Sequence, residues 1–261
     1  MIDPVAFHLG PLEVRWYGIA YALNLGICIW ILTRLNKKQT VFKDNNQIYD
    51  FAFWVFLAGV ILGGRLGYIL FYNLPYYLAH PAKILAVWEG GMSIHGGMIG
   101  SIIVAFILGK KWKLDLLKLF DLIAVPAAVA DTLPRVANFI NRELYGRIIE
   151  NPHWKWLGVD FGDGQLRYPS QLFQSASSVV FFLIMLFIFS RKPKPGILLS
   201  SYFILYGLLR IMVEFWRQPD EQLGFLWGGV TMGQLLSGLM VLAGVVLLFW
   251  FKKGEFRKKE S

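Results

Sequence analysis

Residues 197–217 read ILLSSYFILYGLLRIMVEFWR, and this stretch decides the class of fold. It holds about 20 predominantly apolar residues, the length at which an α-helix spans the hydrocarbon core of a membrane. Polar side chains interrupt the apolar run at intervals of four, at Tyr202, Tyr206, Arg210 and Glu214. Residues spaced by four share one face of a helix. The stretch therefore predicts a transmembrane helix with one polar stripe, and such a stripe suits a polar ligand.

The rest of the chain has the composition of a membrane protein. Of its 261 residues, 56% are hydrophobic and only 16% are charged, whereas about a quarter of the residues in a soluble domain are charged. The predicted spans are Trp16–Leu35, Tyr49–Tyr72, Ile94–Gly109, Leu119–Phe139, Ser170–Phe189, Ile197–Phe215 and Val230–Phe251. We therefore expect an all-α membrane protein, a bundle of about seven transmembrane helices that forms a single integral membrane domain over residues 1–261.

Basic residues gather in short clusters that follow apolar stretches, at Lys37–Lys38, Lys110–Lys113, Arg191–Lys194 and from Lys252 onward. Such clusters mark the cytoplasmic side of a membrane protein. The net charge of +9 is thus an indication of topology and not of nucleic-acid binding. An odd number of spans places all these clusters on one side, with the N-terminus outside and the C-terminus in the cytoplasm. Residues 140–169 then lie outside as a small external cap.

Charged residues inside the predicted spans are the strongest sign of function. Arg65, Arg135, Arg210 and Glu214 all fall within apolar stretches, where a charge is costly and usually faces a partner, a cavity or a substrate path. A single Arg–Glu pair fits helix packing as well as function, but three arginines in one small bundle favour function. Arginine matches the bidentate geometry of a phosphate, and a nearby carboxylate holds the guanidinium in one rotamer.

A histidine stands among glycines where the third predicted span begins. His95 is flanked by the pairs Gly90–Gly91 and Gly96–Gly97, and glycines permit a close approach of backbone or substrate. A lone histidine is often a hydrogen-bonded structural residue. At a membrane boundary it is also a reasonable general base or proton relay, and the sequence leaves both alternatives open.

Metal and nucleophile chemistry find no support in the sequence. Cys28 is the single cysteine, and the four histidines at positions 8, 80, 95 and 153 are far apart. Zinc sites require closely spaced His and Cys ligands. The nucleophile elbow of serine hydrolases and the phosphate-binding P-loop are absent as well. We therefore expect neither a metal nor another cofactor.

The same segments resemble the bacterial prolipoprotein diacylglyceryl transferases, in order along nearly the whole chain. The matching segments are Asp3–Phe7, Arg15–Gly18, Gly63–Tyr68, Gly90–Gly97, Arg135–Gly146, Tyr206–Arg210, Val213–Phe215 and Arg217–Asp220. The segment from Arg135 is similar to the family signature Arg-x-Gly-Asn-Phe-x-Asn-x-Glu-x-x-Gly. Any one of these motifs is weak evidence, but their succession in order is highly specific.

The chain departs from the family pattern at three places. Pro134 and Ala137 replace two glycines of the signature. Asp131 and Thr132 stand where the family has small or apolar residues. The family segment His-Pro-Ser/Thr-x-Leu-Tyr-Glu is represented by residues 168–174, YPSQLFQ, without its His and Glu.

The resemblance implies a reaction and its partners. The family moves a diacylglyceryl group from phosphatidylglycerol to the lipobox cysteine thiol of a preprolipoprotein, whose signal peptide it recognises, and releases glycerol phosphate. It works in the bacterial inner membrane, without a metal or another cofactor. The thiolate is the competent nucleophile, so the enzyme needs a base, cations for the departing phosphate and an apolar cleft for two acyl chains.

The resemblance also implies roles for particular residues. The catalytic set is His95, Arg135 and Arg210: the arginines hold the phosphate, and the histidine assists thiol deprotonation or orients the head group. Glu143 and Glu214 orient the arginines or the cap. The expected substrate-binding set is Tyr17, Arg65, Arg135, Asn138, Glu143, Gly146, Tyr206 and Glu214.

A transporter or channel is the alternative class of function, because intramembrane charges also line transport paths. Two features of the sequence count against it: no inverted repeat is visible, and seven spans divide poorly into two halves. A purely structural membrane scaffold is a third alternative. It leaves the stripe from Tyr202 to Glu214 without a purpose.

Overall fold

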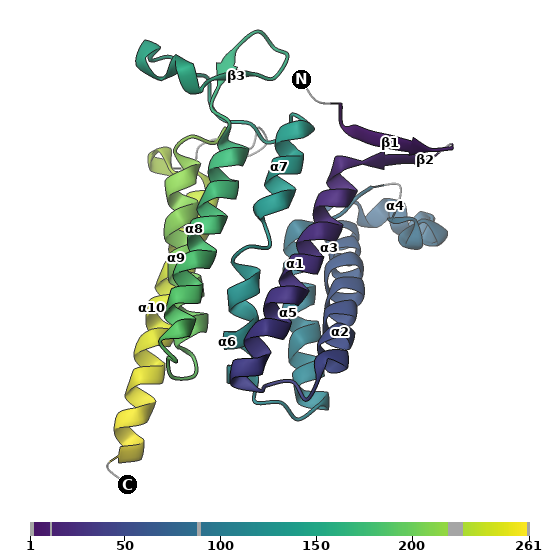
Figure 1. Cartoon of the computed structure of the whole chain (residues 1–261). Helices are drawn as coiled ribbons and strands as arrows, with labels where there is room; N and C mark the ends of the chain where they lie inside the picture. The colour runs from purple at the N-terminus through teal and green to yellow at the C-terminus, as the bar shows by residue number, and fades with distance from the viewer. Residues whose placement is uncertain (1–2, 11, 88–89, 219–226, 260–261) are drawn as a thin grey trace. The chain divides into compact units, whose positions relative to one another are not determined.

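Long apolar helices dominate the structure (Figure 1), a computed structural model that describes residues 3–10, 12–87, 90–218 and 227–259. Five of these helices are long and apolar enough to cross a membrane. They are Trp16–Gln39, Asn45–Tyr72, Ser170–Ser190, Ile197–Glu214 and Met232–Lys253. The prediction of a helical, multi-pass membrane protein is confirmed. Trp88, Glu89, Pro219, Asp220 and most of the predicted outer segment Arg217–Gly229 lie outside the described residues.

The remaining two predicted spans have a different form. The third is α5 (Ile94–Lys111), a helix of 18 residues. The fourth is divided into α6 (Leu116–Ala127) and α7 (Thr132–Ile140), which are separated by turns. Pro126 lies at the end of α6, where a proline removes a backbone donor and disturbs the preceding helical turn. The predicted span Leu119–Phe139 is therefore interrupted by turns, and the total of seven spans stays a prediction.

The chain folds as two compact units, one of residues 33–119 and one of residues 1–32 together with 120–261. In the unit of residues 33–119, one continuous helical rod runs through three elements. They are α2 (Asn45–Trp54), the π-helical η1 (Val55–Leu62) and α3 (Gly63–Tyr72). The short helices α4 (Leu74–Ala79) and η2 (Pro81–Leu85) follow before α5.

Glycines set the packing of α5 against this rod. A Cβ added to Gly96 would lie 2.9 Å from the Cα of Gly67, and one added to Gly59 would lie 2.6 Å from the Cα of Ser101. Real Cβ atoms do not approach a backbone so closely, so only glycine fits these positions. Small residues spaced by four allow two membrane helices to meet backbone to backbone. This contact positions the helix that carries His95.

The other unit is built around α8 (Ser170–Ser190), α9 (Ile197–Glu214) and α10 (Met232–Lys259). Helix α8 packs against both α7 and α9, and α9 packs along α10. The N-terminal segment forms the hairpin of β1 (Val5–Leu9) and β2 (Leu12–Arg15), which leads directly into α1 (Trp16–Gln39). These contacts place α7, α8 and α9 beside one another (Figure 1).

A buried carboxylate fixes the start of α9. Asp121 of α6 is only 3% exposed, and it accepts hydrogen bonds from the backbone amides of Gly196 (2.6 Å) and Leu199 (2.7 Å). The first amides of a helix have no partner within the helix, so a side-chain acceptor there is stabilising. Asp121, which falls in an apolar stretch of the sequence, is thus a structural cap for the helix with the polar stripe.

The predicted cap, residues 140–169, is tied to the other end of α9. It contains η4 (Pro152–Leu157) and a hairpin of β3 (Val159–Asp160) and β4 (Leu166–Arg167). The amide of Arg147 donates to the Trp216 carbonyl at 2.9 Å, and its Nε donates to the Arg217 carbonyl at 3.0 Å. The cap segment therefore holds the turn where the stripe of α9 ends.

The glycine packing of α5 gives a prediction with a matched control. Gly96→Ala forces a methyl group against the backbone of α3, so we expect a loss of about 1–3 kcal/mol in the free energy of unfolding. Gly26→Ala in α1 is the control, because a Cβ there meets nothing within 4 Å. That change should be neutral or stabilising by less than about 1 kcal/mol. Unfolding of the detergent-solubilised variants measures both, and equal stabilities would contradict the packing argument.

Candidate functional site

The signature arginine is held by two neighbouring helices. Arg135 of α7 donates from Nε to Oδ2 of Asp131 at 2.8 Å. The same oxygen accepts a hydrogen bond from Nε2 of Gln174 on α8, at 2.9 Å. Asp131 and Arg135 lie four residues apart, which places them on one side of the chain as it enters α7. The carboxylate therefore fixes the guanidinium through Nε, while Gln174 fixes the carboxylate.

A chain of amides continues from the other side of this guanidinium. Nη1 of Arg135 donates to Oδ1 of Asn138 at 3.4 Å, and Nδ2 of Asn138 donates to Glu143 at 3.3 Å. Glu143 also accepts a hydrogen bond from Asn141 at 3.3 Å. Nη2 of Arg135 makes no hydrogen bond within the described part of the chain. The structure thus brings together three of the predicted site residues and leaves one guanidinium nitrogen available.

The polar stripe of α9 lies on one helix face, as its spacing predicts. The Tyr202 and Tyr206 rings stack with centroids 6.0 Å apart and an interplanar angle of 4°. Nη1 of Arg210 lies 2.5 Å from Oε2 of Glu214, and Nη1 of Arg217 lies 3.6 Å from Oε1 of the same carboxylate. Glu214 therefore divides its charge between two guanidiniums.

Helix α10 and the turn before it complete the setting of Glu214, which is 1% exposed. Thr231 donates its hydroxyl to Oε1 of Glu214 at 3.1 Å. A Cβ added to Gly233 would lie 2.8 Å from the same oxygen, so a glycine leaves the space that the carboxylate occupies. Thr231 and Gly233 are supporting residues that the sequence does not reveal, because their role depends on the packing of α10 on α9.

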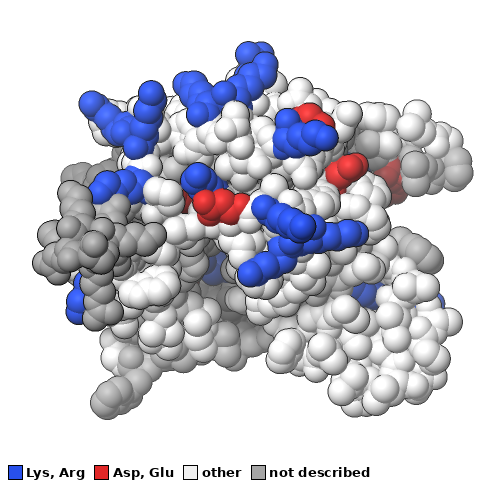
Figure 2. All heavy atoms as spheres, turned by 90° about the horizontal axis from the view of Figure 1, so that it is seen from below, with Lys and Arg blue, Asp and Glu red and all other residues white. Residues whose placement is uncertain are grey.

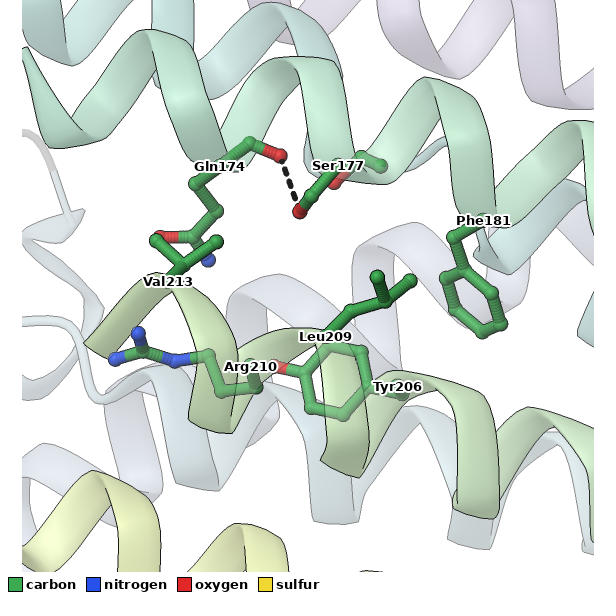
Figure 3. A pocket seen from close by; sticks show the side chains of 8 residues that line it. Gln174, Ser177, Phe181, Tyr206, Leu209, Arg210 and Val213 are labelled. Carbon is green, nitrogen blue, oxygen red and sulfur yellow. Dashed lines mark hydrogen bonds between the residues drawn. The ribbon is translucent and has the colours of Figure 1, made fainter. Parts of the chain in front are cut away.

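A pocket lies between α8 and α9 (Figure 3). Its polar wall includes Gln174 from α8, and Tyr206 and Arg210 from α9. Nη1 of Arg210 is buried, and it contacts the Glu214 carboxylate at 2.5 Å. The guanidinium that lines the pocket is therefore held by an ion pair within α9.

The two predicted catalytic arginines of this unit are linked through the wall of the pocket. Gln174, which lines the pocket together with Arg210, donates to Asp131 at 2.9 Å, and Asp131 accepts a hydrogen bond from Arg135 at 2.8 Å. Guanidiniums bind phosphate through charge-assisted hydrogen bonds. The arrangement is therefore chemically suited to an anion such as a phosphate.

Tyr17 enters this setting through a second tyrosine. Its hydroxyl lies 3.3 Å from that of Tyr21, and the two rings are 4.9 Å apart. Helix α1 meets the segment before α7 at Asn24, whose Nδ2 donates to the Ala130 carbonyl at 2.5 Å. Tyr21, one helical turn after Tyr17, is absent from the predicted set, although its spacing of four residues is visible in the sequence.

Gly146, another predicted site residue, has a backbone role. Its amide donates to the Tyr168 carbonyl at 2.9 Å, and a Cβ there would lie 2.6 Å from the Trp216 carbonyl. It also forms a β-bridge with Arg217. Only glycine fits between the segments that contain Tyr168 and Arg217. The geometry of Gly146 therefore points to a role in the shape of the turn rather than to contact with substrate.

Arg65 and His95 belong to the unit of residues 33–119. Arg65 is 2% exposed, and all three of its side-chain nitrogens donate to backbone carbonyls. The acceptors are the carbonyls of Lys83, Ile84, Ala86, Gly90 and Gly91. The donors of Arg65 therefore organise the segment before α5, and its expected substrate-binding role stays a prediction. His95 is exposed in the first turn of α5, which Ser93 caps through Gly96 at 3.2 Å.

No cluster of three His, Cys, Asp or Glu side chains that suits a metal ion occurs among the described residues. The polar groups of the site are instead arginines, their carboxylates, amides and phenols. Such a set can bind an anion, donate hydrogen bonds to ester or hydroxyl oxygens and stabilise charge that develops on a leaving group.

Comparison with known proteins identifies the family. Residues 4–250 match the family model described as prolipoprotein diacylglyceryl transferase. A phosphatidylglycerol–prolipoprotein diacylglyceryl transferase of Pseudomonas aeruginosa is 44% identical over 252 residues, which are 95% of this chain and 93% of that protein. Proteins of the same name from Pseudomonas fluorescens (45% identity, 95% and 93% covered) and Ectopseudomonas mendocina (42% identity, 97% and 96% covered) are also similar. The chain therefore belongs to the prolipoprotein diacylglyceryl transferase family.

Proposed function

We propose that this protein transfers a diacylglyceryl group from phosphatidylglycerol to the lipobox cysteine thiol of preprolipoproteins. The observation that carries the proposal is that, in a member of this family, Arg210 lines a pocket to which Arg135 is joined by hydrogen bonds through Asp131 and Gln174. A phosphate diester is the group in phosphatidylglycerol that such a pair binds. The proposed setting is the inner membrane of a bacterium.

The reaction exchanges one bond at a glycerol carbon. The cysteine sulfur attacks the carbon that bears the phosphate ester, so a C–S bond forms and a C–O bond breaks. The bonding electrons leave with glycerol phosphate, and the thiol proton passes to a base. Because the thiolate is the nucleophile, the enzyme contributes deprotonation, orientation and stabilisation of the leaving phosphate. No metal or other cofactor is required in this scheme.

The geometry supports the following proposed residue roles. Arg135 and Arg210 hold the phosphate and stabilise its developing charge, while Glu214 orients Arg210 through their 2.5 Å contact. Asn138, Tyr206 and Tyr17 donate hydrogen bonds to lipid oxygens, and Glu143 orients Asn138. Gly146 keeps its place as a backbone residue that shapes the site. His95 assists deprotonation of the thiol or orients the head group.

The direct test is transfer by the purified protein. The detergent-solubilised protein is mixed with phosphatidylglycerol and a lipobox peptide, and the peptide mass and the released glycerol phosphate are measured. We expect a thioether-linked diacylglyceryl peptide and one glycerol phosphate for each modified peptide. The control peptide carries Ser in place of the lipobox Cys and should stay unmodified. Absence of the thioether product with an intact substrate would overturn the proposal and reopen the transporter alternative.

The arginines and the histidine should differ in their response to pH. Lysine lacks the planar fork of arginine, so Arg135→Lys and Arg210→Lys should each lower the transfer rate about 30- to 1,000-fold, or roughly 2–4 kcal/mol. His95→Gln keeps a hydrogen-bonding side chain but removes a base. Raising the pH towards the thiol pKa, near 8.5 in free cysteine, should partly restore that variant and neither lysine variant.

Transfer rate against pH for wild type and the three variants measures this difference. If His95→Gln follows the wild-type pH profile, His95 orients or packs and is not the base. Near-normal rates in both lysine variants would show that Arg135 and Arg210 do not hold the phosphate.

The orientation of the chain is a separate part of the proposal: N-terminus outside and C-terminus in the cytoplasm. In each unit taken alone, the basic clusters lie at one end. Lys37 and Lys110 stand at the C-terminal ends of α1 and α5. In the other unit, contact of Gly196 with Phe251 brings Arg191 and Lys252 to one end. Figure 2 shows Lys and Arg side chains, in blue, at the surface that is seen from below. Positive charges favour the cytoplasmic side.

Thiol labelling tests this orientation in a Cys28→Ala background. We expect Lys38→Cys and Lys252→Cys to react with a membrane-impermeant reagent only after the membrane is opened. Gln165→Cys in the cap segment should react in intact spheroplasts. The reverse pattern of labelling would contradict the proposed topology.

A further inference from the structure

A carboxylate and an amide from two distant segments meet beside Arg135. Asp131, at the N-cap of α7, and Gln174 of α8 are 43 positions apart in the sequence, yet Gln174 Nε2 donates to Asp131 Oδ2 at 2.9 Å. One negative charge and one neutral amide therefore share a single hydrogen bond at this place.

That carboxylate oxygen is also the acceptor for Arg135. Nε of Arg135 lies 2.8 Å from Oδ2 of Asp131, so one oxygen joins the guanidinium and the amide of Gln174. Gln174 is buried, 7% exposed, and Asp131 is partly buried. A carboxylate in this setting is costly unless a cation and hydrogen-bond donors compensate it. Both compensating groups are present, and they come from two different helices.

We infer that Asp131 and Gln174 together position Arg135, with the single carboxylate at the start of α7 and a neutral amide on α8. The inference rests on the proposed function. Asp131 holds the guanidinium at Nε and so directs its terminal nitrogens to the phosphate. Gln174 supplies a neutral donor, because a second carboxylate at that place would repel the first and offset the positive potential of the site. Neither residue needs to touch the substrate.

This arrangement of one carboxylate and one amide predicts a specific pattern among isosteric variants at positions 131 and 174. Asp131→Asn removes the charge that holds Arg135, and we expect kcat to fall tenfold or more with a smaller change in KM for phosphatidylglycerol. Gln174→Glu adds a second carboxylate within hydrogen-bond distance of the first, and its kcat should fall severalfold or more. The double variant Asp131→Asn, Gln174→Glu has one carboxylate and one amide again, with their positions exchanged. Its kcat should return to within about threefold of wild type, because the two effects are coupled.

A matched control moves the charge to the wrong place on the same helix. Gln171 is buried on α8 three residues before Gln174, but its amide donates to the Glu143 carbonyl at 2.7 Å and not to Asp131. The double variant Asp131→Asn, Gln171→Glu has the same total charge as the rescuing pair. It should be at least as impaired as Asp131→Asn alone.

The experiment measures kcat and KM for phosphatidylglycerol in the purified variants, together with their unfolding temperatures. Recovery of kcat in the exchanged pair but not in the control pair supports the positioning role. A rate for the exchanged pair equal to the product of the two single effects would overturn it. So would normal activity of Asp131→Asn, or losses of rate that follow the unfolding temperature alone. An inactive wild type would contradict the proposed function itself, whereas an active wild type without rescue contradicts only this inference.

Discussion

A guanidinium inside the hydrocarbon is stable only where carboxylates and amides take the place of water. This constraint organises the unit that contains α7, α8 and α9. Arg135 has Asp131, and Arg210 has Glu214. Each carboxylate requires support in turn, which Gln174 and Thr231 supply. In the polar site, carboxylates therefore balance the charge of the arginines, while Nη2 of Arg135 makes no hydrogen bond within the described part of the chain.

Helix positions follow from the same requirement. Asp121 of α6 fixes the start of α9, and Arg147 of the cap segment holds its end. These two contacts set the position of α9 along its axis, and with it the position of the polar stripe. Gly233 makes room for the Glu214 carboxylate between α9 and α10. The turns between α6 and α7 place Asp131 at the N-cap of α7, where it forms an ion pair with Arg135 four residues later. The irregular backbone thus serves the site, as broken helices in membrane proteins do where they line polar groups.

Spacing along a single helix is the most informative part of the sequence. The face shared by Tyr206, Arg210 and Glu214 follows from intervals of four, and the motifs in their order along the chain are specific enough to indicate the family. Contacts between distant segments do not follow from the sequence. The hydrogen bond from Gln174 to Asp131 depends on the packing of α8 against α7, and the role of Arg65 depends on a loop whose carbonyls converge on it. Periodicity along a helix carries no information about either contact.

The central claim is that Arg135 and Arg210 together supply enough positive charge to bind the departing phosphate. Calorimetric titration of the purified protein with glycerol phosphate tests it directly, with glycerol as the neutral control. The account predicts saturable binding of glycerol phosphate and no binding of glycerol at the same concentrations, because only the phosphate engages the guanidiniums. Equal binding of both compounds, or binding of neither, would contradict the claim.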